Sequence, residues 1–500
     1  MTSPQTVGGL LTRAAADAPD RRALTVPDGA GSWTFSQLLR DARAVAHGLL
    51  SEHQPGDRVA TMVPNGADAV LLQLGTALAG MTLVPLNVRT TPDEIDHALR
   101  LSGAAVLYTA DEADRAGAHT GAPIRALGSW HEVAREGGAE LPEVMPRSLA
   151  QIQLTSGTTG RPKGVRIRHD ASVVTARSFA SRLGSPAGSV WVNPMPLFHT
   201  AGNVLGTLGA LSVLAEQVVL AFEPAAVLRA AAQHRASLLA AAPTLLHMLR
   251  THPDFGGADL TALRVIYTGG STMTADFLSS VETSFGARVS VAFGMTETCG
   301  AALQTAPFDD ADETRWSTVG IPLPGTEARV VDPSGVPAPP GSPGELLLRG
   351  PGVTDGYHDD TAATAAAFDE DGWLRTGDLA TVDGAGRYRI VGRSKELIKS
   401  GGENVSPVEV ETVLEADPAV ERAAVVGLPD DRWGEVVVAF VVPSAGRAGS
   451  LRTEALETHC RRHLSRFKVP RRWFVVGELP LTGSGKVRRA ELRRLAREDV

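Results

Sequence analysis

Short apolar runs alternate with longer segments of helical pattern through roughly the first four hundred residues of the chain. Residues 58–63 (RVATMV) predict a strand that ends at the turn signal PNG, and residues 67–81 have the length and pattern of a helix. Residues 82–86 return as a strand, and a second unit of this kind runs through residues 237–241, 245–250 and 264–267. Such alternation predicts an α/β fold with mostly parallel sheets and helices on both faces. Ligands of these sheets bind at the carboxyl ends of the strands.

The pattern changes in the last third of the chain. Glycine and proline become dense between residues 332 and 356, and strand-like pieces such as residues 345–349 predict a small β-rich subdomain. From residue 394 onward the order is helix (408–415), strands (423–426 and 436–442), helix (453–464) and strand (473–476), followed by a basic end. We therefore predict a large N-terminal domain at 1–393, made of two mostly parallel α/β subdomains and the β-rich one, and a small α+β C-terminal domain at 394–500. Four arginines of the basic end are expected to be solvated: Arg488, Arg489, Arg493 and Arg494.

Length and composition indicate a globular protein of at least two domains. The chain has 500 residues, of which 43% are hydrophobic and 21% charged. The 48 Lys and Arg residues against 56 Asp and Glu give a net charge of −8, which argues against a nucleic-acid partner.

The cysteines and the apolar stretches indicate the cellular compartment in which the protein is expected. Cys299 and Cys460 are the only cysteines and lie far apart, so we expect no disulfide framework and a cytoplasmic protein. The first residues lack the basic stretch and apolar core of a signal peptide. The apolar stretches at 69–85 and 204–222 are interrupted by polar residues, so we expect buried core segments and no membrane span.

Residues 154–165 (LTSGTTGRPKGV) are the most informative segment for chemistry. They place four hydroxyl side chains, three glycines and a lysine in one stretch. Glycines let backbone N–H groups approach an anion, and the hydroxyls and the lysine add donors and positive charge. The Walker spacing is absent, because Arg161 and Pro162 separate Gly160 from Lys163. The segment predicts a polyphosphate-binding loop; a solvated Gly/Thr loop is the alternative from composition alone.

The twelve-residue string resembles the phosphate loop of the adenylate-forming superfamily, which includes acyl-CoA synthetases, peptide-synthetase adenylation domains and beetle luciferases. Further segments resemble motifs of that superfamily in the same order and cover nearly the whole chain. They are residues 33–38 (WTFSQL), 196–199 (PLFH), 268–271 (TGGS), 293–298 (FGMTET), 375–379 (RTGDL), 392–395 (GRSK), 400–407 (SGGENVSP) and 481–486 (LTGSGK). The chain is most similar to a stand-alone acyl-CoA ligase.

The resemblance implies an ATP site. It assigns the triphosphate to Thr155, Ser156, Gly157, Thr158, Thr159 and Lys163, and adenine to Gly269, Gly270, Ser271, Phe293 and Gly294. Phe293 stands where many relatives have tyrosine, so adenine stacking is retained without the hydroxyl. Glu297 is the implied Mg²⁺ ligand, and Thr296 the implied donor to the α-phosphate. Asp378 is expected to accept hydrogen bonds from the ribose hydroxyls, with Arg393 reaching the ribose or a phosphate.

The resemblance also implies a mobile C-terminal domain. Lys486 takes the role of bridging the acyl carboxylate and the α-phosphate during adenylation. Lys395 stands at the hinge about which the small domain rotates once pyrophosphate leaves. Gly401 and Gly402 then line the passage for the pantetheine arm of CoA.

The acid pocket is placed by position in the motifs. Its candidates are mostly small residues: His199, Thr200, Ala201, Asn203, Gly294 and Cys299. His199 is grouped with the catalytic residues as a gate beside the acid, rather than as a proton-transfer base. No cation is placed there for a second carboxylate and no aspartate for an α-amino group. An aromatic or short-to-medium aliphatic monocarboxylic acid is therefore expected.

These expectations combine into one reaction. ATP and the acid give acyl-AMP and pyrophosphate, and CoA then displaces AMP to give acyl-CoA. The alternative keeps adenylation and passes the acyl group to a carrier protein, an amine or another small nucleophile. A nucleotide-binding protein without catalysis is disfavoured, because Lys486, Glu297 and Asp378 are all present. The expected assembly is a monomer or homodimer.

Overall fold

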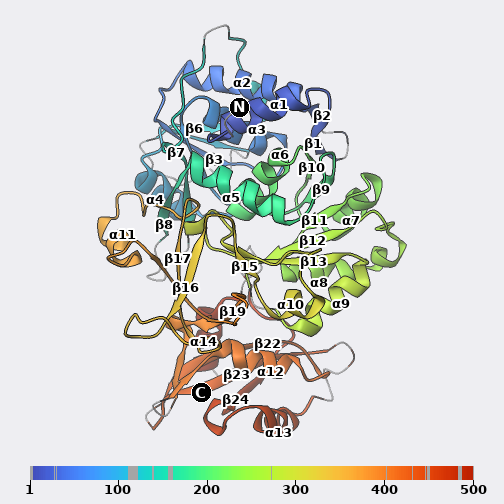
Figure 1. Ribbon diagram of the computed structural model, residues 1–500, viewed down its shortest axis with the longest axis vertical. Helices are drawn as coiled ribbons and strands as arrows, with labels where there is room; N and C mark the ends of the chain where they lie inside the picture. Colours follow the sequence, from blue (N-terminus) through green and yellow to red (C-terminus); the bar gives the residue numbers. More distant parts are fainter. Residues whose placement is uncertain are drawn as a thin grey trace.

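The computed structural model describes residues 4–27, 29, 31–110, 122–137, 140–155, 162–271, 273–400, 403–430, 432–444, 446, 451–481 and 487–498. The molecule is elongated, with the α/β part at one end and the C-terminal segment at the other (Figure 1). Strands β16 (Glu327–Val331), β17 (Gly344–Arg349) and β19 (Tyr388–Arg393) lie between the two. The described residues form four β-sheets.

Two large sheets carry the α/β part. One has six strands in the order β6 (Ile124–Ala126), β5 (Val106–Thr109), β3 (Arg58–Met62), β4 (Thr82–Pro85), β7 (Leu149–Thr155) and β8 (Lys163–Arg168). The other has nine, in the order β15 (Ile321–Pro322), β14 (Leu303–Gln304), β13 (Arg288–Phe293), β12 (Val265–Gly269), β11 (Leu238–Ala240), β9 (Val190–Asn193), β10 (Glu216–Val219), β1 (Arg22–Val26) and β2 (Gly31–Thr34). Every pair is parallel except those made by β8, β14, β15 and β2 at the edges.

Helices cover both sheets because their apolar faces are buried against them. The largest apolar cluster joins strands of both sheets to α1 (Val7–Asp17), α2 (Phe35–Leu50), α3 (Ala67–Leu78) and α5 (His169–Arg182). The start of α2 is set by a capping box, in which Thr34 and Gln37 satisfy each other's backbone N–H groups. The remaining helices of this part are α4 (Pro92–Ser102), α6 (Gly209–Ser212), α7 (Pro224–Gln233), α8 (Pro243–Thr251), α9 (Ala275–Phe285), α10 (Asp312–Ser317) and α11 (Thr361–Ala367).

The last two sheets follow in sequence. The β-rich subdomain is an antiparallel sheet of β16 (Glu327–Val331), β17 (Gly344–Arg349), β18 (Leu374–Val382) and β19 (Tyr388–Arg393). The C-terminal sheet has β21 (Glu403–Val405), β20 (Ile398–Ser400), β23 (Gly434–Pro443) and β22 (Val420–Asp430), with β24 (Arg472–Val475) parallel to β23. Its helices are α12 (Pro407–Glu415), α13 (Thr453–His463) and α14 (Arg489–Glu498).

The fold class expected from the sequence is confirmed, with large parallel α/β sheets, a small antiparallel sheet and a small α+β unit. Both cysteines are buried and unbridged, as expected. One expectation is wrong: Arg489 is not solvated, because its side chain is only 17% exposed and is paired with Glu396 and Glu411. The division of the chain at residue 393 stays a prediction.

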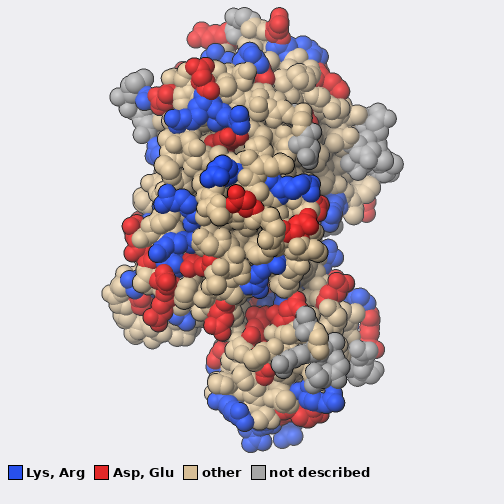
Figure 2. Space-filling view, turned by 90° about the vertical axis from the view of Figure 1, so that its right-hand side faces the viewer, with Lys and Arg blue, Asp and Glu red and all other residues tan. Residues whose placement is uncertain are grey.

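The surface is compatible with a small-molecule enzyme. Basic and acidic side chains are interspersed over the face that Figure 2 shows, without one sign dominating it. Within the described part of the chain, no helix combines the length and apolarity needed to cross a bilayer.

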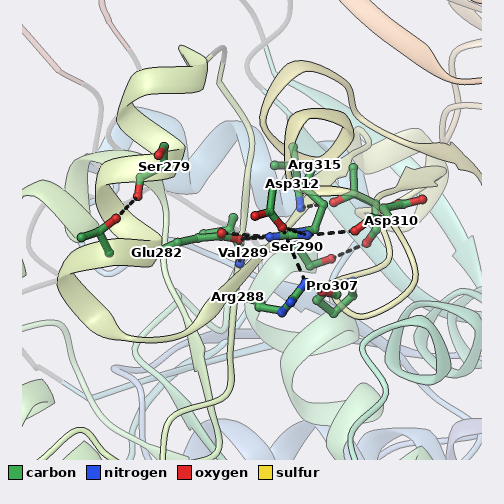
Figure 3. Close-up of polar contacts among 12 residues, drawn as sticks. Ser279, Glu282, Arg288, Val289, Ser290, Pro307, Asp310, Asp312 and Arg315 are labelled. Carbon is green, nitrogen blue, oxygen red and sulfur yellow. Dashed lines mark hydrogen bonds and ion pairs between the residues drawn. The ribbon is translucent and has the colours of Figure 1, made fainter.

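A buried ion pair fixes the end of the nine-stranded sheet. Arg315 of α10 is 1% exposed and donates to both carboxylate oxygens of Glu282 at 2.8 and 2.9 Å (Figure 3). The same carboxylate accepts the backbone N–H of Val289 in β13 at 2.7 Å, and Arg315 also donates to the carbonyl of Asp310. Helices α9 and α10 are thereby tied to the strand that ends at Phe293.

We expect Arg315→Met to lower the free energy of unfolding by about 3–5 kcal/mol, because it leaves the Glu282 carboxylate buried without its counter-charge. Arg13→Met is the control, since it removes the exposed pair with Asp17 and should cost roughly 0.5 kcal/mol or less. Urea unfolding followed by tryptophan fluorescence measures both. Equal midpoints for the two variants would contradict the structural role of Arg315.

Candidate functional site

The carboxyl ends of strands from both large sheets meet at one place. Asn65 follows β3 of the six-stranded sheet and lies against the segment that follows β9 of the nine-stranded sheet. Its side-chain amide donates to the carbonyls of Met195 and Leu220 at 2.9 and 3.0 Å, and its oxygen accepts from the N–H of Leu197 at 2.9 Å. From β7, the Gln153 amide donates to the carbonyl of Phe198 at 2.8 Å. Parallel sheets place ligand-binding loops at this edge.

The predicted phosphate loop connects β7 to β8 as the end of an antiparallel hairpin. Thr155 and Lys163 are register partners at its base. Residues 156–161 lie outside the described residues, and with them Ser156, Gly157, Thr158 and Thr159. The ammonium of Lys163 lies 4.9 Å from the centre of the Tyr357 ring, which fixes a positive charge at the exit of the loop.

Glu297 lies beside this hairpin. It sits in the short helix η5 (Thr296–Thr298) and is 7% exposed. The Tyr357 hydroxyl donates to its Oε1 at 2.8 Å, and the carbonyl of Glu297 accepts from the N–H of Thr354 at 2.7 Å. Burial and the adjacent carboxylate raise the pKa of Tyr357, so its hydroxyl keeps the proton that it donates. Thr296 precedes Glu297 and is half-buried.

Residues 354–358 hold Glu297 and the hairpin together. The Thr354 hydroxyl donates to the carbonyl of Arg166 in β8 at 2.6 Å, and the N–H of His358 donates to the carbonyl of Gly164 at 2.7 Å. The same short segment therefore contacts the phosphate hairpin through Thr354 and His358, and Glu297 through Thr354 and Tyr357.

The predicted adenine residues follow β12 and β13, which are parallel neighbours. Gly269 ends β12, with Gly270 and Ser271 after it, and Phe293 ends β13. A Cβ on Gly294 would lie 2.4 Å from the carbonyl oxygen of Gly300, so no other residue fits there. Phe293 packs on the apolar cluster of the β-rich subdomain. The structure therefore brings the adenine residues to one edge.

The predicted ribose residue Asp378 is 3% exposed on β18. Its Oδ1 accepts from Nε of Arg393 at 2.7 Å, and the two residues are register partners across β18 and β19. The Asp378 carboxylate is buried in the middle of β18, whereas the Arg393 side chain at the end of β19 is half exposed.

The predicted gate continues into a wide helix. His199 lies next to Phe198, with ring centres 4.6 Å apart, and leads into the π-helix η3 (Ala201–Leu208). The Asn193 amide donates to the carbonyl of Gly202 at 3.1 Å, and this contact inside the helix ladder accounts for the widened turn. The hydroxyl of Tyr267, in β12, donates to the carbonyl of Ala201 at 2.9 Å.

The candidate pocket residues around the gate are neutral and buried. Thr200, Asn203 and Cys299 are at most 6% exposed. Burial raises the pKa of the Cys299 thiol to about 12, so the thiol stays protonated and unreactive.

The remaining predicted residues belong to the C-terminal part. Lys395 lies in the short helix η6 (Ser394–Glu396) and is exposed. Gly401, Gly402 and Lys486 lie outside the described residues. Gly392 precedes η6 with φ +154°, and a Cβ there would lie 2.7 Å from the Ser406 hydroxyl, so the turn requires glycine.

Comparison with known proteins agrees with this arrangement. Residues 11–358 match the family described as AMP-binding enzyme, and residues 409–486 match its C-terminal domain. The chain belongs to the AMP-binding enzyme family.

Its relatives match it over nearly the whole length of the chain. A feruloyl-CoA synthase of Amycolatopsis sp is 36% identical, with 98% of this chain and 99% of the relative covered. A 3-[(3aS,4S,7aS)-7a-methyl-1,5-dioxo-octahydro-1H-inden-4-yl]propanoyl:CoA ligase of Mycobacterium tuberculosis is 37% identical, with the same coverage.

Two solved structures are similarly close. ATP-bound MatB from Rhodopseudomonas palustris is 29% identical, covers 99% of both chains and has a TM-score of 0.90. The amide bond synthetase McbA from Marinactinospora thermotolerans is 29% identical, covers 98% and 99%, and has a TM-score of 0.88.

In this AMP-binding enzyme, sequence reasoning missed three residues that shape the site. Tyr357, Gln153 and Asn65 all contact predicted site segments through their side chains. Asn65 was read only as part of a turn, and its partners lie 130 to 155 residues away, so no local pattern indicates them.

We expect Asn65→Ala to raise the KM for the acid about tenfold, because it releases three backbone groups of the segments after β9 and β10. Asn87→Ala is the control, since the hydrogen bonds of Asn87 to the described residues lie within its own turn, to Arg89 and Thr90. Initial rates at saturating ATP measure the effect. Similar KM values in both variants would contradict a role for Asn65 in placing the gate.

Proposed function

We propose that this chain is an AMP-forming acid–thiol ligase, which converts a monocarboxylic acid, ATP and CoA into acyl-CoA, AMP and pyrophosphate. One observation carries the proposal. Lys163, Glu297 and Tyr357 come from three distant segments and meet at the base of the phosphate hairpin. A cation and a buried carboxylate at the base of this loop suit a triphosphate and its metal ion, which supports the proposal. The full-length similarity to CoA ligases supports it.

The chemistry explains why ATP is needed. A carboxylate is a poor electrophile because its leaving group would be oxide. In the first step a carboxylate oxygen bonds to the α-phosphorus of ATP, and the bond to the bridging oxygen of pyrophosphate breaks. In the second step the sulfur of CoA bonds to the acyl carbon, and the bond to AMP breaks. Donors that stabilise charge on the α-phosphate accelerate the first step, and Thr296 and Lys486 are assigned that role.

The residues present fit a magnesium ion. Among the described residues, no cluster of three or more His, Cys, Asp and Glu side chains forms a metal site. Mg²⁺ bound to a nucleotide needs no such cluster, because it is held by one or two carboxylates together with phosphate oxygens and water. Glu297 provides a carboxylate held in place through one oxygen by Tyr357. The ion, when bound, neutralises phosphate charge, and Glu297 orients it.

The nucleoside is assigned to the strand ends around β13 and β18. Phe293 provides a flat face for adenine, Gly269, Gly270 and Gly294 leave room for it, and Ser271 lies at the mouth. Asp378 accepts from the ribose hydroxyls, with Arg393 holding the carboxylate. Thr155 and Lys163 hold the triphosphate together with residues 156–161.

The acid is assigned to the pocket behind His199. Thr200, Asn203 and Cys299 are buried and uncharged, which suits an apolar acid with a single carboxylate. A feruloyl-CoA synthase among the relatives supports an aromatic acid, within the wider class of aromatic or short-to-medium aliphatic acids.

The acceptor is CoA, with Gly401 and Gly402 along its path and Lys395 at the hinge. The similarity to an amide bond synthetase supports one alternative acceptor, an amine that takes the acyl group. A carrier protein is a second alternative and would replace CoA at the same step. Acid-dependent AMP release with and without CoA tests the assignment. CoA-dependent release with thioester formation is expected, and release that is indifferent to CoA would reject the CoA ligase.

We expect Lys486→Ala to reduce acid-dependent ATP–pyrophosphate exchange by a factor of about a thousand, because charge on the α-phosphate loses its cation. Thioester formation from supplied acyl-adenylate should remain within about threefold of the parent enzyme, since the C-terminal domain is expected to have rotated Lys486 away before that step. An equal loss of both steps would contradict the role assigned to Lys486.

We expect Glu297→Gln to raise the Mg²⁺ concentration for half-maximal exchange about tenfold, because a neutral amide binds the ion more weakly. Tyr357→Phe should act in the same direction and less strongly, because it removes only the hydrogen bond that orients the carboxylate. Glu313→Gln, at an exposed position in α10, is the control. A Mg²⁺ dependence unchanged in Glu297→Gln would rule out the metal role.

A further inference from the structure

Arg489 is the most heavily paired arginine next to the predicted catalytic loop. It begins α14, and its guanidinium contacts both oxygens of Glu411, through Nη1 to Oε1 and through Nη2 to Oε2 at 3.1 Å. Nη1 also donates to the carbonyl of Val425 at 2.7 Å, and Nε lies 3.2 Å from Oε2 of Glu396. Three elements of the C-terminal domain, η6, α12 and β22, therefore meet on one side chain.

The partners of Arg489 lie next to segments with predicted roles in catalysis. Glu396 is the last residue of η6, directly after the predicted hinge residue Lys395. Glu411 is in α12, just after the predicted CoA loop at residues 400–407. Arg489 itself is three residues beyond Lys486. One guanidinium thus joins the start of α14, just after the predicted lysine loop, to η6 beside the predicted hinge and to α12.

The backbone closes the lysine loop at its base. Leu481 and Val487 form an isolated antiparallel bridge, and the N–H of Arg488 donates to the carbonyl of Pro480 at 2.8 Å. These bonds join Leu481 and Val487, whose side chains pack on the apolar cluster of β22 and β23. The Arg489 contacts add a polar link from the start of α14 to Glu411 of α12.

The chemistry of the side chain suits this task. A guanidinium is planar and binds a carboxylate through two parallel hydrogen bonds, which fixes orientation as well as distance. The Arg489 side chain is 17% exposed and that of Glu411 13%, so water competes little for the contact. The neighbouring Arg488 is different, since its side chain is 55% exposed and lies 3.8 Å from Glu491.

We infer that Arg489 is a positioning residue, which fixes the start of α14, directly after the predicted lysine loop, against η6 and α12 and thereby supports the action of Lys486 in adenylation. The inference rests on the role proposed for Lys486. Arg489 acts on the first half-reaction alone, because only that step uses the lysine. Its loss lowers kcat and leaves the KM for ATP unchanged, since the ATP residues lie on the other domain.

The test compares Arg489→Met with Arg488→Met in the full-length enzyme. Arg489→Met is expected to lower kcat for ATP–pyrophosphate exchange about a hundredfold, the size of effect that a misplaced catalytic group produces. Thioester formation from supplied acyl-adenylate should stay within about threefold of the parent. A change of that size is much smaller than the effect of misplacing a catalytic group. Arg488→Met should match the parent in both steps. Arg489→Lys keeps the charge, loses the bidentate contact and should show a partial loss in exchange.

Two results would overturn the inference. One is an unchanged rate of ATP–pyrophosphate exchange in Arg489→Lys. This variant also tests the inference if Arg489→Met does not fold. The other is a parallel fall of both half-reactions with the melting temperature, because that is the signature of a structural residue.

A double variant separates this inference from the proposed function. If Arg489 works through Lys486, adding Arg489→Met to Lys486→Ala causes no further loss of exchange. If the two losses multiply, Arg489 acts on its own and the inference fails. Full exchange activity in Lys486→Ala alone would instead reject the proposed role of the lysine.

Discussion

The buried carboxylate of Glu297 is the constraint on which the site depends. A carboxylate removed from water is costly unless it is hydrogen-bonded or placed next to a cation. Here the Tyr357 hydroxyl provides the hydrogen bond, and the Lys163 ammonium lies over the ring of the same tyrosine. The phosphate hairpin, η5 and residues 354–358 must therefore fold against one another before the carboxylate is tolerated. The same condition brings a cation and an anion to the two sides of Tyr357, at the position that we propose for the metal–triphosphate complex.

The two large sheets make this arrangement rigid. Their carboxyl ends are joined by Asn65 and Gln153, which bond to backbone atoms of the gate rather than to other side chains. Backbone contacts of this kind fix the path of the chain and leave the gate side chains free to differ. Behind β13, the Arg315–Glu282 pair holds the strand that carries Phe293 and Glu297 at its end. Positioning of the residues predicted to bind the nucleotide thus depends on a charged pair that lies outside the predicted site.

Much of the fold could be predicted from the sequence, because it depends on patterns among residues close together in the chain. The alternation of strands and helices, the strand-end positions of Gly269 and Phe293, and the helix opened by Pro407 all follow from short-range patterns. The Tyr357–Glu297 bond was not accessible, because it joins residues 60 apart with no periodicity between them. The prediction that Arg489 is solvated was wrong for the same reason. It stands in a basic run that resembles a solvated tail, and its partner Glu411 is 78 residues away.

The widened helix η3 has a consequence for how the acid pocket changes in evolution. A π-helix accommodates one more residue per turn than the regular helix from which it differs. Loss of a single residue from Ala201–Leu208 would return one wide turn to the regular ladder, which shifts the residues of that turn while the helix beyond it keeps its register. Because this helix follows His199 directly, such a change would alter the side chains beside the predicted acid pocket while both sheets stay intact. A one-residue insertion or deletion is therefore a route to a different wall of the predicted pocket that leaves the rest of the fold in place.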